Sequence, residues 1–382
     1  MENKVLEKIE KFKEVIILLL LSIWLTMPFL KLLMLTYKFE QYNYIKIVGV
    51  IGIFFLFFYI VKNCYKNENL KKFLKKILPI LIFSVYMIWT LISCIFSPDR
   101  GRAFYGTTYR LDGYVTYLAY AGFFSLSFLL DSTKYKKRVL SFFVLFAVIN
   151  CLIIVLSNNF YCMNIFWIKD YKNGVFLNSN HYGYYLLLAT ICANFLFVIE
   201  EKVYLKIGYL ISYIILMYYL IINDTFGVYL AIGITLVIFF IYCLCSKKKR
   251  VISSISVIIF IVMSCVVCDN GRNIAFQNVS TLVNDVKKVA SIITRSESEG
   301  DKKSDVEKAG SGRMALWVNG VKFFLQRPLL GYGPENLEAK YAEVNIDQDR
   351  PHNLIIQLAT TSGLPGLILY LLAVRYYYKK SN

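Results

Sequence analysis

Ten apolar stretches of membrane-spanning length run through this chain of 382 residues, and they constrain its fold more than any other feature. A helix needs roughly 17–25 apolar residues to cross the hydrocarbon core of a bilayer. The stretches lie at about 15–35, 45–61, 77–96, 114–130, 139–156, 182–199, 207–222, 228–245, 251–268 and 354–374. A hydrophobic content of 57% is also too high for a soluble globular protein. The sequence therefore predicts an all-α fold, a polytopic membrane helical bundle of about ten transmembrane helices.

The net charge of +18 is explained by topology. If the N-terminus is inside, the cytoplasmic pieces hold 23 Lys and Arg residues, whereas the short external loops hold 6. This asymmetry follows the positive-inside rule, which sets the orientation of multi-pass proteins. We therefore expect both termini to be cytoplasmic, membrane lipids to be the partners of the basic loops, and no nucleic-acid partner.

Three parts are predicted along the chain. Residues 1–268 form a transmembrane bundle of nine spans, residues 269–353 form a large helical extracytoplasmic loop, and residues 354–382 form the last span with a basic cytoplasmic tail. Within the loop, residues 295–312 are rich in Ser, Glu, Lys and Gly and are predicted to be a flexible linker. Residues 313–353 follow, and this segment holds most of the residues that could take part in a reaction.

Two short helices are predicted in this last segment. The first starts at Arg313 and stops at Pro328, and one of its faces carries Leu316, Trp317, Val321 and Phe324. The second is predicted to open at Pro334 and to run through Tyr341, because proline is favoured in the first turn of a helix.

Several polar residues lie in or beside the predicted external loops. Arg100 and Arg110 have the planar donor fork that suits phosphate, although arginines of a hydrophilic turn also reach lipid phosphates. Asn178 and Asn180 stand where a span begins, so they can cap that helix. No ATP-binding glycine loop and no metal-ligand spacing is present, so we expect no metal and no cofactor.

Arginine side chains can stabilise a diphosphate leaving group, and a histidine can take a proton from an attacking hydroxyl. Together they fit glycosyl transfer from a lipid-linked diphosphate sugar. The same residues also fit a structural loop near lipid headgroups, so the residues alone leave both interpretations open.

A family resemblance narrows this choice. GRMALWVNGVKFFLQRPLLGYGPENL, followed by RPHNLIIQLATTSGLPGLILYL, resembles the core signature of the bacterial O-antigen ligase and polymerase superfamily. Its members are integral-membrane glycosyltransferases that act at the outer face of the cytoplasmic membrane. The resemblance implies an undecaprenyl-diphosphate-linked glycan donor, a glycan, lipid or wall acceptor, and a metal-independent, inverting reaction.

The resemblance also implies roles for individual residues. Arg313 would bind the donor diphosphate, and His352 would orient or deprotonate the acceptor hydroxyl. The substrate-binding candidates are Arg110, Arg100, Asn353, Trp317 and Asn180.

The chain departs from the family pattern in two places. Phe226 stands where ligases carry an arginine after Ser or Thr, and a single span follows His352 where relatives add more. A transporter or flippase for the same lipid-linked glycan, and a catalytically inactive membrane scaffold, are therefore retained as alternatives.

Overall fold

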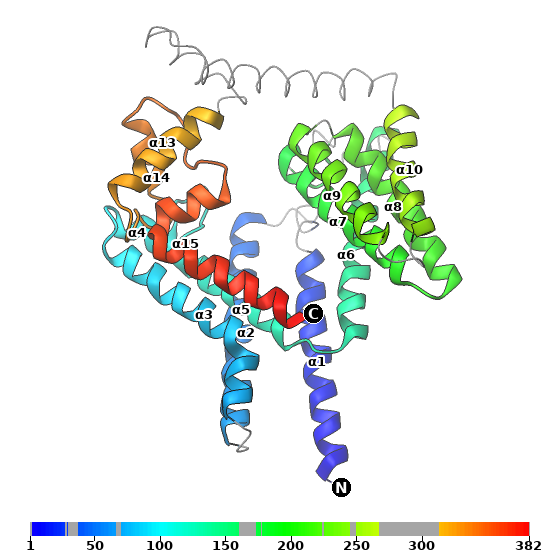
Figure 1. Cartoon of the computed structure of the whole chain (residues 1–382), viewed down its shortest axis with the longest axis horizontal. Helices are drawn as coiled ribbons and strands as arrows, with labels where there is room; N and C mark the ends of the chain where they lie inside the picture. Colours follow the sequence, from blue (N-terminus) through cyan, green and yellow to red (C-terminus); the bar gives the residue numbers. More distant parts are fainter. Residues whose placement is uncertain are drawn as a thin grey trace. The chain divides into compact units, whose positions relative to one another are not determined.

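The computed structural model describes residues 2–26, 29, 37–65, 70–159, 173–176, 178–223, 225–244, 250–266 and 313–381. These residues form helices and connecting turns, and no β-strand occurs among them (Figure 1). The predicted linker 295–312 lies outside the described residues. The helices form two compact units.

The first unit is a membrane bundle around α7. Its helices are α1 (Glu2–Thr26), α6 (Thr133–Asn159), α7 (Ser179–Ile199), α8 (Val203–Ile222), α9 (Phe226–Leu244) and α10 (Arg250–Val266). Ala189 and Ala193 of α7 are fully buried beside Leu216 and Met217 of α8. Small residues at such positions let two helix backbones approach closely within a membrane.

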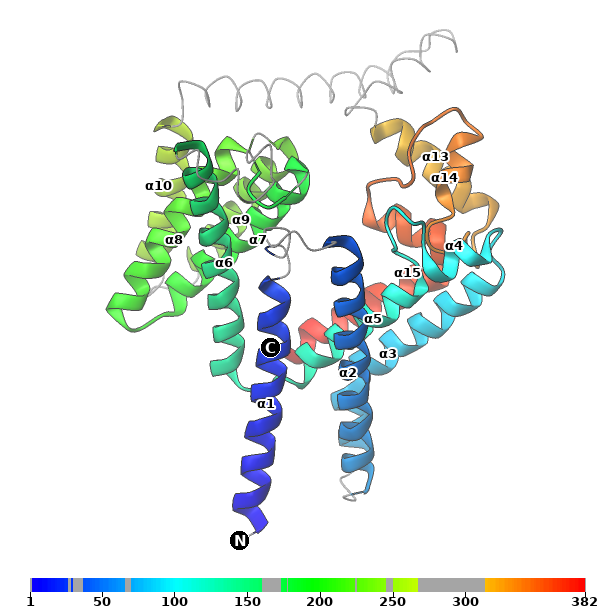
Figure 2. The ribbon, with the colours of Figure 1, turned by 180° about the vertical axis from the view of Figure 1, so that it is seen from behind.

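The second unit combines spans with the predicted signature segment. It contains most of α2 (Tyr37–Tyr65), with α3 (Leu70–Ile95), α4 (Arg100–Tyr105), α5 (Tyr114–Leu129), α13 (Arg313–Gln326), α14 (Leu337–Ala342) and α15 (Leu354–Ser381). Helices α3 and α15 are far apart in the sequence yet lie side by side, which both views show (Figures 1 and 2).

The predicted class of fold is confirmed. Six helices are long and apolar enough to cross a membrane, and three shorter apolar helices accompany them in the described part of the chain. The six candidate spans are Tyr42–Cys64, Lys71–Ile95, Thr133–Leu156, Ser179–Ile199, Val203–Ile222 and Leu354–Lys379. The protein is therefore a multi-pass helical membrane protein, while the count of ten spans and their orientation stay predictions.

Helix α15 is broken at Gly363, and the break shapes the second unit. Gly363 has φ 69° and ψ −177°, and Pro365 follows it without a backbone donor. The break frees carbonyl groups that a continuous helix would bond. In a bilayer such groups must find partners within the protein.

Partners for the freed carbonyls come from two other segments. The amides of Tyr332 and Gly333 donate to the carbonyls of Thr360 (2.9 Å) and Thr361 (2.8 Å). From α3, Trp89 Nε1 donates to the Ser362 carbonyl at 2.9 Å, and Ser93 Oγ donates to the Thr361 carbonyl at 2.7 Å. The turn before α14 is thereby fixed against the last span.

Two details of the predicted short helices are corrected. Helix α14 begins at Leu337, and the segment from Pro334 is a turn, because Glu335 has a positive φ of 59° that no helix contains. The buried face of α13 carries Leu316 and Phe323. Val321, which was expected on that face, is 45% exposed.

Candidate functional site

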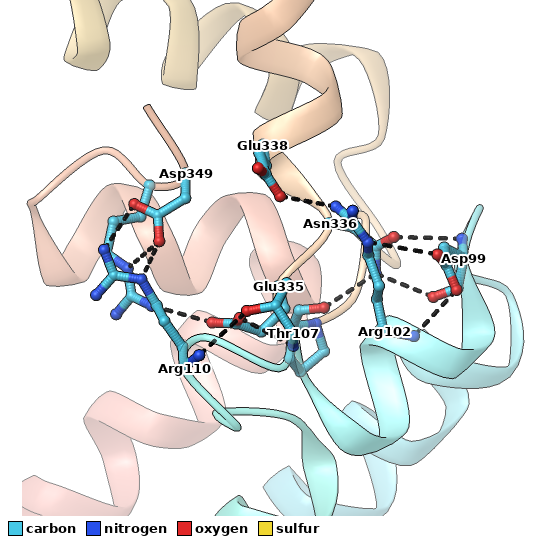
Figure 3. A network of polar contacts seen from close by, with 10 residues as sticks. Asp99, Arg102, Thr107, Arg110, Glu335, Asn336, Glu338 and Asp349 are labelled. Atoms are coloured by element: carbon cyan, nitrogen blue, oxygen red, sulfur yellow. Dashed lines mark hydrogen bonds and ion pairs between the residues drawn. The ribbon is translucent and has the colours of Figure 1, made fainter. Parts of the chain in front are cut away.

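Two segments that are more than 200 residues apart, both predicted to be external, form one polar layer at the end of α3, α5 and α15. The Asn336 side chain accepts from the Asp99 amide and donates to the Asp99 carbonyl, each at 3.2 Å. Ser97 Oγ donates to the Tyr332 carbonyl at 2.7 Å. Figure 3 shows the pairing of Asn336 with Asp99, and beside it Arg102 binds Glu338 at 2.8 Å. The loop after α3 is therefore bound to the turn before α14.

The arginines at the centre of this layer are held by carboxylates. Arg110 binds Asp349 through two nitrogens, with Nη2 3.0 Å from Oδ1 (Figure 3). Arg350 Nη2 lies 3.0 Å from Glu335 Oε1, and Arg350 Nη1 lies 3.7 Å from Asp112 Oδ2. Charge-assisted hydrogen bonds of this kind fix the positions of both partners. Because Asp349 and Arg350 each bind a partner on another segment, these bonds hold residues 349–353 in place.

His352 lies next to this network at the entrance to α15. It has a positive φ of 50° and is exposed, and its Nε2 lies 3.4 Å from Gln348 Oε1. Its backbone is positioned by Trp317, whose Nε1 donates to the Pro351 carbonyl at 3.0 Å. A non-glycine residue in the left-handed region is a local strain that the surrounding contacts must support.

The electrostatic surroundings of His352 favour its neutral form. Protein atoms packed beside the imidazole desolvate it, and this desolvation lowers its pKa below the ordinary value of 6.5. Asp349 raises the pKa, while the positive charges of Arg350, Arg110 and Arg313 lower it. The imidazole is therefore neutral at pH 7 and able to accept a proton.

The structure thus brings Arg313 and Arg110 into the electrostatic surroundings of His352. Arg313 is the exposed first residue of α13, and Arg100 is the exposed first residue of α4. In the described part of the chain, neither Arg313 nor Arg100 forms an ion pair with a carboxylate. Arg110, in contrast, is bound to Asp349.

The predicted asparagines have structural partners. Asn353 Oδ1 accepts from the amides of Ile355 (3.0 Å) and Ile356 (3.2 Å), so it caps α15. The expected cap of α7 is confirmed for Asn178, whose side chain accepts from the amide of Asn180 at 2.8 Å. Asn180 is exposed and belongs to the first unit.

Sequence reasoning missed four members of the network: Asp112, Glu335, Asp349 and Arg350. Their only signal was proximity to the quoted motifs, since Asp112 lies in YRLDG and Arg350 directly precedes PHN. Which carboxylate meets which arginine depends on the fold. Among the described residues, no cluster of three or more His, Cys, Asp or Glu side chains is placed to hold a metal ion.

The fold and the site define a multi-pass helical membrane protein with an exposed histidine whose electrostatic surroundings include three arginines. Residues 211–371 match the model of a protein family described as O-Antigen ligase. The match includes Arg313, His352 and the break of α15 at Gly363, and it supports the resemblance to the O-antigen ligase and polymerase superfamily. No curated protein and no solved structure matches the chain.

Proposed function

We propose that this protein transfers or polymerises an undecaprenyl-diphosphate-linked glycan at the extracytoplasmic face of the cytoplasmic membrane. The observation that carries the proposal is His352, which is exposed at the entrance to a candidate membrane span and whose pKa is lowered by desolvation and by the charges of Arg350, Arg110 and Arg313. The family match supports a ligase-like or polymerase-like activity in general terms.

In this reaction the acceptor hydroxyl attacks the anomeric carbon of the donor sugar. The new carbon–oxygen bond forms as the bond to the diphosphate oxygen breaks, and the electron pair leaves with the diphosphate. His352 takes the proton of the hydroxyl, and attack from the face opposite the diphosphate inverts the anomeric centre. Arg313 stabilises the negative charge that grows on the leaving group, with Arg100 as a further exposed cation on the same layer.

Several of the remaining predicted substrate residues then act by positioning the backbone around His352. Trp317 and Asn353 hold the backbone on either side of His352, so they are positioning residues. Arg110 holds Asp349, which precedes His352 by three residues. Asn180 stays a proposed substrate contact.

The test uses purified protein in nanodiscs with an undecaprenyl-diphosphate-linked oligosaccharide, an acceptor glycan and EDTA. Released undecaprenyl diphosphate and lengthened glycan are measured for the wild type, Arg313→Ala and His352→Ala. Loss of general acid–base catalysis lowers rates by roughly 10²–10⁴-fold, so we expect that loss for His352→Ala. The matched controls are His181→Ala and Arg375→Ala, which change an exposed histidine and an exposed arginine outside the site.

The pH profile gives a second readout. Wild-type turnover should fall as the pH drops through the pKa of His352, and this fall should be centred below the ordinary histidine value of 6.5. The residual turnover of His352→Ala should lack this acid limb. Variants that match an active wild type would refute the site, and glycan uptake into vesicles without covalent transfer would favour a transporter.

A further inference from the structure

A cavity of about 460 Å³ lies within the second unit, between α3, α5 and α15. This volume falls in the range of sites that bind small molecules. Its walls are mainly aromatic and aliphatic and include Phe83, Tyr86, Phe124 and Tyr370. Two charged residues, Asp112 and Arg350, line it at the end nearest to His352.

The lining of the cavity suits a single apolar chain. Its residues on α15 come from both sides of the break at Gly363, from Leu354 to Leu358 and from Tyr370 to Val374. They face residues of the candidate span α3 and of the apolar helix α5. An apolar chain placed there would lie along the spans, with its polar end beside Asp112.

The charged residues at the mouth of the cavity determine which polar group the bound molecule can carry. Three carboxylates, from Asp112, Glu335 and Asp349, surround the two guanidinium groups of Arg110 and Arg350, so one negative charge is in excess. A diphosphate is disfavoured at this mouth, because both arginines are already bound to carboxylates. A neutral group rich in hydroxyls could instead donate hydrogen bonds to Asp112, whose Oδ1 lies 3.4 Å from the Tyr120 hydroxyl.

We propose that this cavity binds a neutral amphiphile, an apolar chain that carries sugar hydroxyls, and that Asp112 binds those hydroxyls at its mouth. The chemistry is that of a glycolipid acceptor, whereas the diphosphate of the donor meets Arg313, which has no carboxylate partner among the described residues. The assignment of the amphiphile as the acceptor rests on the proposed function; the binding of a neutral glycolipid does not.

The titration of Asp112 supports this assignment. Burial raises the pKa of Asp112 to about 6, so its carboxylate is charged at pH 7 and becomes protonated below pH 6. Arg350 and Arg110 lower this pKa and Glu335 raises it. The titratable and charged groups that face Asp112 are Tyr86, Arg110, Tyr117, Tyr120, Glu335 and Arg350. Binding of the hydroxyl group should accordingly weaken between pH 7 and pH 5.

The test uses the full-length protein in nanodiscs and two photoreactive probes of equal chain length. One is a decyl β-glucoside and the other a decyl phosphate, each with a diazirine in the chain, and the labelled peptides are identified by mass spectrometry. Asp112→Asn removes the charge, and Val374→Trp fills the far end of the cavity from a partly exposed position. Asp347→Asn, an exposed residue of the same external segment, is the matched control, and Asp112→Glu tests rescue.

We expect the glucoside to label α3 and α15 and the phosphate to compete poorly. Asp112→Asn should weaken glucoside binding by about tenfold, which is the usual loss for a hydrogen bond to a charged group, and Asp112→Glu should restore part of it. Val374→Trp should abolish labelling, while Asp347→Asn should leave it unchanged. Stronger labelling by the phosphate would overturn the proposal. Equal labelling by both probes that is unchanged in Asp112→Asn would overturn it as well.

Kinetics separate this inference from the proposed function. In an active enzyme, Asp112→Asn should raise the KM for the acceptor about tenfold and leave the KM for the donor unchanged. A wild type that binds the glucoside without transferring glycan would refute the proposed function and leave the cavity assignment standing. A rise in the donor KM alone would overturn the cavity assignment and leave glycosyl transfer standing.

Discussion

Replacing Gly363 by alanine should destabilise the second unit by at least about 3 kcal/mol and abolish activity. A Cβ on Gly363 would lie 1.9 Å from the Leu329 carbonyl oxygen, and the backbone has φ 69°, which strains any side chain. Relief of this clash would separate Leu364 from Pro328, whose carbonyl accepts from the Leu364 amide at 2.7 Å. The turn that pairs with the broken helix would then be displaced, and the segment carrying His352 with it.

Thermal unfolding in detergent measures this effect, followed by circular dichroism and by the loss of soluble protein. Gly208→Ala is the matched control, because no atom lies within 4 Å of a Cβ at that position in α8. Alanine within a helix is more favourable than glycine by roughly 0.5–1 kcal/mol, so Gly208→Ala should keep or slightly raise the melting temperature. An unchanged melting temperature for Gly363→Ala would show that α15 has no break there.

Replacing Glu335 by alanine should cost about 1–3 kcal/mol of stability, the usual penalty for removing a hydrogen-bond partner from a buried polar group. The Glu335 side chain is 6% exposed. Its carboxylate binds Arg350 at 3.0 Å and accepts from Thr107 Oγ1 at 2.8 Å. Its loss leaves Arg350 with the more distant carboxylates of Asp112 and Asp349, and it removes the hydrogen bond that joins Thr107 to the turn before α14.

The neighbouring Glu338 provides the control for this prediction. Its side chain is 51% exposed and binds Arg102 at 2.8 Å on the surface of the same layer. An exposed pair contributes about 0–1 kcal/mol, so Glu338→Ala should shift the melting temperature little. Equal destabilisation by both variants would contradict the distinction between the buried and the exposed pair.

The sequence was sufficient to predict the class of fold, because each span needs a long apolar run and each run can be recognised locally in the sequence. It also indicated the family, through residues that lie close together in the chain around Arg313 and His352. The cap on α7 could be predicted for the same reason, since Asn178 bonds amides two and three residues away.

The parts that could not be predicted depend on contacts between distant segments. The bond of Arg110 to Asp349 joins residues 239 positions apart, and no local pattern reveals such a pairing; the role of Arg110 in substrate binding stays a prediction. Proline statistics favoured a helix from Pro334, yet the long-range attraction of Glu335 to Arg350 and Thr107 favours a turn there. The cavity exists only once α3, α5 and α15 are packed together.

The broken helix α15 also has a consequence for biogenesis. As a newly made segment it would enter the bilayer with carbonyl groups at Thr360, Thr361 and Ser362 that lipid cannot bond. Their partners are α3, synthesised much earlier, and residues 332–333, synthesised just before α15. Insertion of α15 is therefore coupled to docking of residues 332–333, so the membrane accepts this helix only as the polar layer is assembled.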